Sequence, residues 1–161
     1  PGAAFGTGSH PTTRLVLAWL EREVRGGECV LDYGCGSGIL AIAAMKLGAA
    51  RAVGVDIDPL ALEAARYNAS ANAVAVEALA ADAPLALEAD LTVANILANP
   101  LRMLAPLLAS HTRPGGRIAL SGVLAGQAGE VLAAYAPWFA MAVEATEGDW
   151  TCLAGARRGR A

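Results

Sequence analysis

The stretch LDYGCGSGIL, residues 31–40, decides how the chain folds. It starts as a short apolar run, passes through three alternating glycines and leads directly into an apolar segment with helical spacing. Glycines at such a junction let the backbone pass close to a ligand, and the first turn of the helix presents free N–H groups toward that ligand. We predict a buried strand over residues 29–34 and a helix over residues 38–48. A purely structural glycine-rich turn is the alternative.

The spacing separates this turn from a dinucleotide-binding turn, whose motif is G-x-G-x-x-G. Here an acidic residue and the glycines strictly alternate, at Asp32, Gly34, Gly36 and Gly38. Asp56 closes the next apolar run, residues 52–57. A carboxylate at that strand end accepts hydrogen bonds from the two hydroxyls of a ribose. Its alternative role is a helix cap, but Asp58 already occupies that position, so we predict that Asp56 binds a ribose.

Strands and helices alternate along the whole chain. We predict further strands over residues 52–57, 73–82, 91–97, 117–123, 138–146 and 149–155, and helices over 14–24, from 59, from 100 to about 110 and over about 127–135. Apolar strands that alternate with helices are typical of a parallel sheet covered on both faces. The last two strands are joined too tightly for a crossover and should form an antiparallel hairpin. The prediction is a doubly wound α/β domain, Rossmann-like, with a mostly parallel seven-stranded sheet and one antiparallel strand near its edge.

Four local signals set the expected boundaries. Thr12 or Thr13 is predicted to cap the first helix. Asp58-Pro59 and Asn99-Pro100 each combine a capping side chain with a proline suited to the first helical turn. Residues 114–116, Pro-Gly-Gly, are predicted to form a turn before the fifth strand.

Composition narrows the classes of partner. The 161 residues are 55% hydrophobic and 17% charged, with a net charge of -3 and a pI near 5.3, which argues against a surface that neutralises nucleic-acid phosphates. Three cysteines without a C-x-x-C spacing suggest neither disulfides nor a metal site. Charged residues interrupt the apolar stretches, which argues against a membrane span. We expect one monomeric domain, residues 1–161, in the cytoplasm, without metal, membrane or nucleic-acid partner.

Four motifs, in this order, resemble the ribosomal protein L11 methyltransferase (PrmA) family of class I methyltransferases. They are FGTGSHPTT (5–13), DYGCGSG (32–38), VDID (55–58) and VANILANPL (93–101). The resemblance implies S-adenosyl-L-methionine as the cofactor and amino groups of a large-subunit ribosomal protein as the methyl acceptors. Members of the family carry a separate N-terminal recognition domain. The resemblance therefore implies that this chain is the catalytic domain alone, and we expect it to bind the cofactor but to methylate the ribosomal protein poorly.

The resemblance also assigns a role to the first segment, residues 1–13, as a lid over the cofactor. It implies that Phe5 packs over the site, that Gly6 and Gly8 let the lid bend and that Thr13 contacts the cofactor. His10 could accept a proton, but we expect it to stabilise the loop and not to be catalytic. A flexible terminus is the alternative, but it does not explain the phenylalanine, histidine and paired threonines together. The cofactor-binding residues that the motifs predict are Phe5, Gly6, Thr7, Gly8, Thr13, Asp32, Gly34, Gly36, Gly38, Asp56 and Asn95.

Asn95 is the predicted catalytic residue, because it ends the fourth strand and faces the crevice where open α/β sheets bind ligands. Many amine and adenine methyltransferases have Asn or Asp followed by Pro-Pro-aromatic here. Asn95-Ile96-Leu97 lacks the aromatic that stacks a flipped base, which argues against a nucleic-acid base as acceptor. The Asn95 carboxamide oxygen, with the carbonyls of Ile96 or Leu97, would orient an amine. A satisfied polar residue at a strand end is the alternative.

Methyl transfer requires a neutral amine, and no strong general base is evident, so we expect desolvation and carbonyl acceptors to favour the neutral form. Two other functions remain open from the sequence. One is a class I methyltransferase for a small molecule or for another protein's lysine, and the other is a non-catalytic cofactor-binding module.

Overall fold

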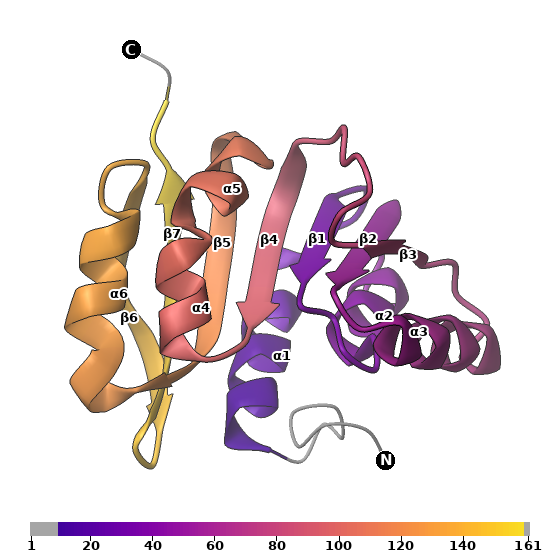
Figure 1. Ribbon diagram of the computed structural model, residues 1–161, viewed down its shortest axis with the longest axis horizontal. Helices are drawn as coiled ribbons and strands as arrows, with labels where there is room; N and C mark the ends of the chain where they lie inside the picture. The colour runs from indigo at the N-terminus through magenta and orange to yellow at the C-terminus, as the bar shows by residue number, and fades with distance from the viewer. Residues whose placement is uncertain (1–9, 160–161) are drawn as a thin grey trace.

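The structure is a computed structural model that describes residues 10–159. A seven-stranded sheet crosses the domain in the order β3-β2-β1-β4-β5-β7-β6 (Figure 1). The strands are β1 (Cys29–Tyr33), β2 (Arg51–Asp56), β3 (Glu77–Ala80), β4 (Ala89–Asn95), β5 (Thr112–Leu124), β6 (Phe139–Glu147) and β7 (Trp150–Arg157). The helices are α1 (Pro11–Glu23), α2 (Ile39–Lys46), α3 (Pro59–Ala71), α4 (Ala98–Met103), α5 (Ala105–Ser110) and α6 (Ala128–Tyr135), with a short 3-10 helix η2 (Ala125–Gln127).

Strand directions confirm the predicted fold class. The pairings β3–β2, β2–β1, β1–β4 and β4–β5 are parallel, whereas β7 is antiparallel to both β5 and β6. The chain moves from β1 outward to β2 and β3, then returns to place β4 on the other side of β1. This reversal is a topological switch point, which in open α/β sheets is where ligands bind beyond the strand carboxyl ends.

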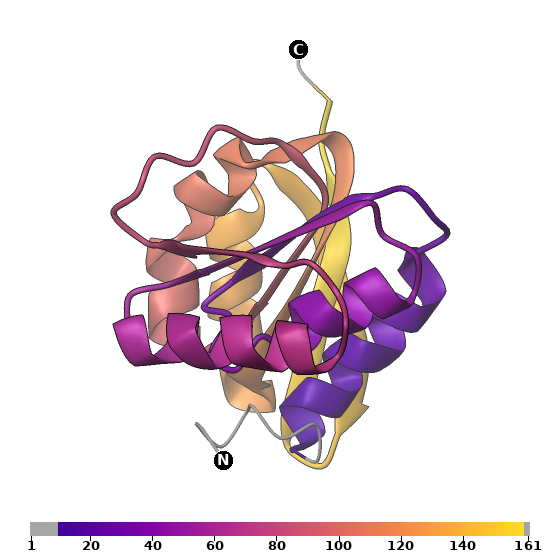
Figure 2. The ribbon, with the colours of Figure 1, turned by 90° about the vertical axis from the view of Figure 1, so that its right-hand side faces the viewer.

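Helices cover both faces of the sheet (Figure 2). Helices α1 and α2 pack on one face, in a core that contains the buried Val16, Trp19 and Leu20. Helices α4, α5 and α6 pack on the opposite face, in a second core around Leu101 and Tyr135. Helix α3 packs against α2, β2 and β3. This layering explains why the early strands are apolar on both sides.

One helix start differs from the sequence-based prediction, and another matches it. Helix α1 begins at Pro11, and its cap is His10, whose side chain accepts the N–H of Thr12 at 3.2 Å; the prediction that Thr12 or Thr13 caps this helix was wrong. Both threonines are instead fully buried in the first turn. Helix α3 starts as predicted, because the Asp58 side chain accepts the N–H of Leu60 at 2.9 Å.

The segment after β4 is also divided differently. The helix predicted from Asn99-Pro100 begins at Ala98 and breaks at Leu104 into α4 and α5. Pro106 lies in the first turn of α5, and it has no N–H to continue the hydrogen bonds of α4. Leu97 precedes the first residue of α4 and no side chain caps the helix, so the prediction that Asn99 caps it was wrong.

Residues 113–116 form a bulge inside β5 rather than the turn predicted before it. Ala89 pairs with Thr112 and Leu91 pairs with Arg117, so the four residues 113–116 of β5 lie opposite the single residue Asp90 of β4. An added Cβ on Gly116 would lie 2.8 Å from the carbonyl oxygen of Arg113. The Pro-Gly-Gly residues thus permit a bulge whose flanks keep pairing with β4.

Among residues 10–159, no helix is long and apolar enough to cross a membrane. Within the same range, no group of three or more His, Cys, Asp or Glu side chains is placed to hold a metal ion. The three cysteines are free thiols.

Candidate active site at the carboxyl ends of the central strands

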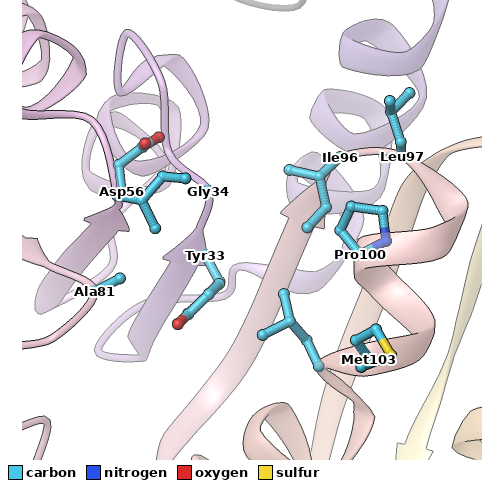
Figure 3. Close-up of a pocket in the computed structure, with 10 residues that line it drawn as sticks. Tyr33, Gly34, Asp56, Ala81, Ile96, Leu97, Pro100 and Met103 are labelled. Atoms are coloured by element: carbon cyan, nitrogen blue, oxygen red, sulfur yellow. The ribbon is translucent and has the colours of Figure 1, made fainter.

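A cavity of about 530 Å³ opens at the switch point of the sheet. Figure 3 shows its two walls, one from the ends of β1 and β2 and the other from the end of β4 and from α4. The lining residues are Tyr33, Gly34, Asp56, Ile57, Ala81, Ile96, Leu97, Pro100, Met103 and Leu104. Its volume falls in the range of roughly 300–1,000 Å³ that is usual for small-molecule sites.

The glycines of the turn after β1 serve different purposes. An added Cβ on Gly34 would lie 2.7 Å from Ile96 Cγ2, so a side chain here would close the gap between β1 and β4. An added Cβ on Gly38 would lie 3.0 Å from the Cβ of Ala65, so this glycine lets α2 and α3 pack closely. Gly36 has open space beside it. The absence of side chains at Gly34 and Gly38 therefore keeps the gap between β1 and β4 open and lets α2 pack closely on α3.

Asp56 ends β2, and its carboxylate lines the cavity. One oxygen accepts the N–H of Gly36 at 2.9 Å, and the other accepts the N–H of Asp58 at 3.0 Å. The sequence argument treated Asp56 as free of the local backbone, and the structure corrects that point. Because a carboxylate oxygen has two lone pairs, each oxygen keeps capacity for a further donor, and the hydrogen bonds fix the direction in which the carboxylate points.

Asp32 is not part of the cavity wall. Its side chain is 1% exposed, and one carboxylate oxygen accepts the N–H of Ala41 in α2 at 3.2 Å. Burial raises the pKa of Asp32 to about 7, and the nearby negative charge of Asp56 adds to the increase. Through this hydrogen bond, the buried Asp32 connects the end of β1 to the first turn of α2.

Asn95 ends β4, and its side chain turns toward α1. Its Nδ2 donates to Thr13 Oγ1 at 3.3 Å, and both side chains are buried. The carboxamide oxygen is also buried, and it has no hydrogen-bond partner among residues 10–159. A buried acceptor in a native protein normally has a partner. An unpaired oxygen at the end of a central strand is therefore a candidate ligand contact.

Ile96 and Leu97 enter the site through their side chains, which line the cavity. The carbonyl oxygen of Ile96 faces Gly122 of β5, where an added Cβ would lie only 2.2 Å away. The carbonyl of Leu97 accepts the N–H of Leu101 as the first hydrogen bond of α4, at 3.1 Å. The role expected for these two carbonyls in orienting an amine stays a prediction.

Sequence reasoning missed most of the apolar wall. Tyr33 lies inside the glycine motif and Ile57 directly follows Asp56, so strand-end position was a usable signal for both. Ala81 follows β3, in the segment 73–89 that held no diagnostic motif. The remaining wall residues lie in α4 and at Leu104, directly after it, and tertiary packing sets the orientation of this helix. The predicted contacts Phe5, Gly6, Thr7 and Gly8 lie outside the described residues.

The sequence of the chain matches one protein family. Residues 1–158 match the family described as ribosomal protein L11 methyltransferase (PrmA). The chain is 59% identical over 157 residues to the ribosomal protein L11 methyltransferase of Cupriavidus metallidurans and 61% identical over 157 residues to that of Dechloromonas aromatica. These alignments cover 98% and 96% of this chain and 52% of each relative. The chain thus spans about half the length of the curated relatives it matches.

A solved structure supports the same grouping. The crystal structure of ribosomal protein L11 methylase from Lactobacillus delbrueckii subsp. bulgaricus superposes with a TM-score of 0.85 at 38% identity, covering 94% of this chain and 81% of that one. The family match over residues 1–158 spans all of the elements that form the cavity. The chain therefore belongs to the ribosomal protein L11 methyltransferase (PrmA) family.

Proposed function

We propose that this chain is the catalytic domain of an S-adenosylmethionine-dependent protein N-methyltransferase that methylates amino groups of ribosomal protein L11. The two relatives compared above are named ribosomal protein L11 methyltransferase. The proposal places the protein in the cytoplasm as a monomer, with a ribosomal protein and no nucleic acid as its macromolecular partner. Residues 1–161 form a single domain in this proposal, and residues 1–13 form a lid.

The described residues fit the cofactor. The Asp56 carboxylate, already oriented by two backbone N–H groups, keeps lone pairs for the two hydroxyls of a ribose. The apolar cavity beside it, between Ile57 and Leu97, suits a flat heterocycle. Gly34 and Gly36 leave the turn without side chains that would block an extended ligand. When bound, S-adenosylmethionine supplies a methyl group activated by the positive charge on its sulfur.

The residues of this chain prepare the acceptor. A lysine amine has a pKa near ~10.4 and an α-amine near ~7.7–8.0, so each is largely protonated in neutral water. Apolar surroundings disfavour the charged form, and Ile96 and Leu97 provide them. The Asn95 oxygen accepts an N–H of the neutral amine and holds the nitrogen lone pair toward the methyl group. S-adenosylmethionine would supply the methyl group to this nitrogen, and the methylated amine would release its extra proton to water.

The observation that carries the proposal is the buried Asn95 oxygen, which has no partner among residues 10–159 although it ends a central strand at the switch point. Buried polar side-chain atoms are usually hydrogen-bonded, and a bound amine would supply the partner that this oxygen lacks. Asn95 is not among the residues that line the cavity, so the proposal requires the bound amine to reach this buried oxygen.

The test measures binding and transfer separately. Calorimetric titration should detect S-adenosylmethionine binding and no comparable binding of NAD. The full-length protein should transfer a labelled methyl group to purified L11, and Asn95→Ala should lower kcat by about a hundredfold, the scale for lost positioning of a reacting group. Binding of NAD in preference to S-adenosylmethionine, or unchanged transfer by a folded Asn95→Ala protein, would contradict the proposal.

A further inference from the structure

Strongly exposed apolar side chains gather at the mouth of the cavity. Ile57, Leu97 and Met103 line the cavity, yet they are 86%, 57% and 82% exposed. Figure 3 shows Leu97 and Met103 on the wall that lies opposite Asp56. A side chain that lines a cavity and keeps more than half of its surface in water lies at the edge of that cavity and not on its floor.

Leu60 extends this apolar edge beyond the cavity. It follows Ile57 by three residues, lies in the first turn of α3 and is 72% exposed. Leu60 does not line the cavity, so a ligand held inside the cavity would leave its side chain in water. We call Ile57, Leu60, Leu97 and Met103 the apolar rim.

The rim differs from the rest of the described surface. Among residues 10–159, the other exposed large apolar side chains do not line the cavity, and apart from Tyr67 they are only 37–45% exposed; they are Leu47, Leu107, Leu124 and Val143. Large apolar side chains that gather in the open mark a site where a protein binds a partner. The rim is therefore the strongest candidate for such a site.

Two carboxylates without an ion pair lie next to the rim residues in sequence. Asp58 lies between two of them, and Asp82 directly follows a cavity residue. Both are exposed, and neither pairs with a Lys or Arg among residues 10–159. Arg102, which precedes Met103, is paired with Glu130 of α6 at 3.7 Å. The mouth of the cavity therefore attracts a positively charged group.

We propose that the apolar rim is the surface on which the substrate protein docks, with apolar residues of the substrate beside the amine that enters the cavity. This inference rests on the proposed function. An amine that belongs to a protein cannot enter the cavity without bringing its neighbouring residues over the mouth. Apolar neighbours bury the rim, and the carboxylates attract the amine while it is still protonated. Recognition by the rest of the full-length protein adds to this local contact.

The experiment compares variants of the full-length protein at saturating S-adenosylmethionine. Leu60→Ser and Met103→Ser each remove one apolar side chain from the rim. Tyr67→Ser is the matched control, because Tyr67 is 74% exposed on the same helix as Leu60 and lies about two turns further along it. All three side chains are exposed, so the substitutions should leave the fold intact, and thermal unfolding verifies this.

We expect Leu60→Ser and Met103→Ser each to raise the KM for L11 by about fivefold, the scale for partial burial of one such side chain. The double variant should raise it by about twenty-fivefold, because separate contacts add in free energy. The kcat and the cofactor Kd should change less than about twofold, since lost docking affects binding alone. Tyr67→Ser should match the wild type.

Two results of this comparison would overturn the inference. A weakened cofactor Kd with an unchanged KM for L11 would mean that the cofactor, or the first segment of this chain, covers the rim. An equal rise in KM for Tyr67→Ser would mean that the effect does not depend on the mouth of the cavity.

Competing peptides test the chemistry of the docked segment. Two lysine peptides of equal length carry either leucine or serine on both sides of the lysine. The leucine peptide should inhibit methylation of L11 by the wild type at the lower concentration, and the double variant should not distinguish the two peptides. Equal inhibition of the wild type by both peptides would contradict an apolar contact.

Hydrogen exchange provides a readout that needs no methyl transfer. With S-adenosylhomocysteine bound to the full-length protein, added L11 should slow amide exchange over residues 57–61 and 97–103 and leave residues 67–72 unchanged. Unchanged exchange in both rim segments would overturn the inference, as would a dimer that the double variant dissociates, since a second copy would then occupy the rim. Absence of methyl transfer by the wild type would refute the proposed function instead, and the exchange data would still decide whether L11 docks on the rim.

Discussion

The N–H of Gly36 donates to a carboxylate oxygen of Asp56 at 2.9 Å, so the end of β2 is joined directly to the glycine turn after β1. Asp56 therefore supports the turn and lines the cavity at the same time. Removing its side chain should affect both the shape of the site and its capacity to bind hydroxyl groups.

We expect Asp56→Ala to weaken S-adenosylmethionine binding by about 1.5–3 kcal/mol, the range for hydrogen bonds to a charged group. Asp58→Ala is the control, because it removes the cap of α3 and costs about 1 kcal/mol of stability without removing a cavity residue. Calorimetry gives both dissociation constants. An unchanged constant in a folded Asp56→Ala protein would refute the ribose contact.

Gly122→Ala should destabilise the fold by about 3 kcal/mol or more. Gly122 has a φ of 89°, and an added Cβ would lie 2.2 Å from the Ile96 carbonyl oxygen, so backbone strain and overpacking both contribute. Urea unfolding measures the loss. Gly129→Ala is the matched control in α6, where nothing lies within 4 Å of the added Cβ; it should stabilise the protein by about 0.5–1 kcal/mol. Similar stabilities for the two variants would contradict this account.

Asp32 should make stability fall as the pH rises from about 4 to about 7. Burial raises the pKa of Asp32 to about 7, whereas an unfolded aspartate has a pKa near ~3.9. In that window the folded state binds more protons than the unfolded state, so the free energy of unfolding declines with a slope of up to about 1.4 kcal/mol per pH unit. Above the window this contribution stays constant.

Asp32→Asn isolates that effect, because it keeps an oxygen for the Ala41 N–H and cannot titrate. Urea unfolding of both proteins over this pH range should show a difference in stability that grows up to about pH 7 and then levels. A difference that is independent of pH would mean that Asp32 is ionised throughout.

Residues 1–161 alone should bind S-adenosylmethionine but methylate L11 slowly. The proposed cofactor contacts all lie within residues 5–95, whereas the chain spans about half of its relatives, whose remaining half would hold the substrate. Without a tethered recognition site the effective concentration of the acceptor is lower by orders of magnitude. The comparison is kcat/KM for residues 1–161 and for the full-length protein at equal cofactor saturation. Equal values would place substrate recognition within this domain.

The sequence correctly predicted the helix starts and turns that depend only on neighbouring residues. Asp58-Pro59 starts α3 as expected, since the cap and the proline act within a single turn. The β6–β7 hairpin was also predictable from its short connection. Pro-Gly-Gly at residues 114–116 was misread as a turn, because only the pairing of both flanks with β4 converts a turn-forming sequence into a bulge.

In the site too, positions set by local sequence could be predicted, whereas contacts between distant parts of the chain could not. Sequence periodicity placed Asp56 and Asn95 at strand ends, where the structure has them. Asp56 lines the cavity, and the catalytic role of Asn95 stays a prediction. The contact between Asn95 and Thr13 depends on how α1 packs across the sheet, and no local pattern encodes a pair so far apart in the chain. His10 as the cap of α1 was missed for a related reason, since histidine is not among the residues that usually cap helices.

The place of β7 has a consequence for how the protein is made. β7 follows the other six described strands in sequence, yet it lies between β5 and β6, and β6 pairs with no other strand within residues 10–159. A nascent chain that ends before Trp150 can therefore assemble the five strands from β3 to β5, with Asp56 and Asn95 in place, while β5 presents an open edge. Open edges pair readily with other chains. Translation that stalls in the β6–β7 connection should thus release a species with a nearly complete site and a strong tendency to aggregate.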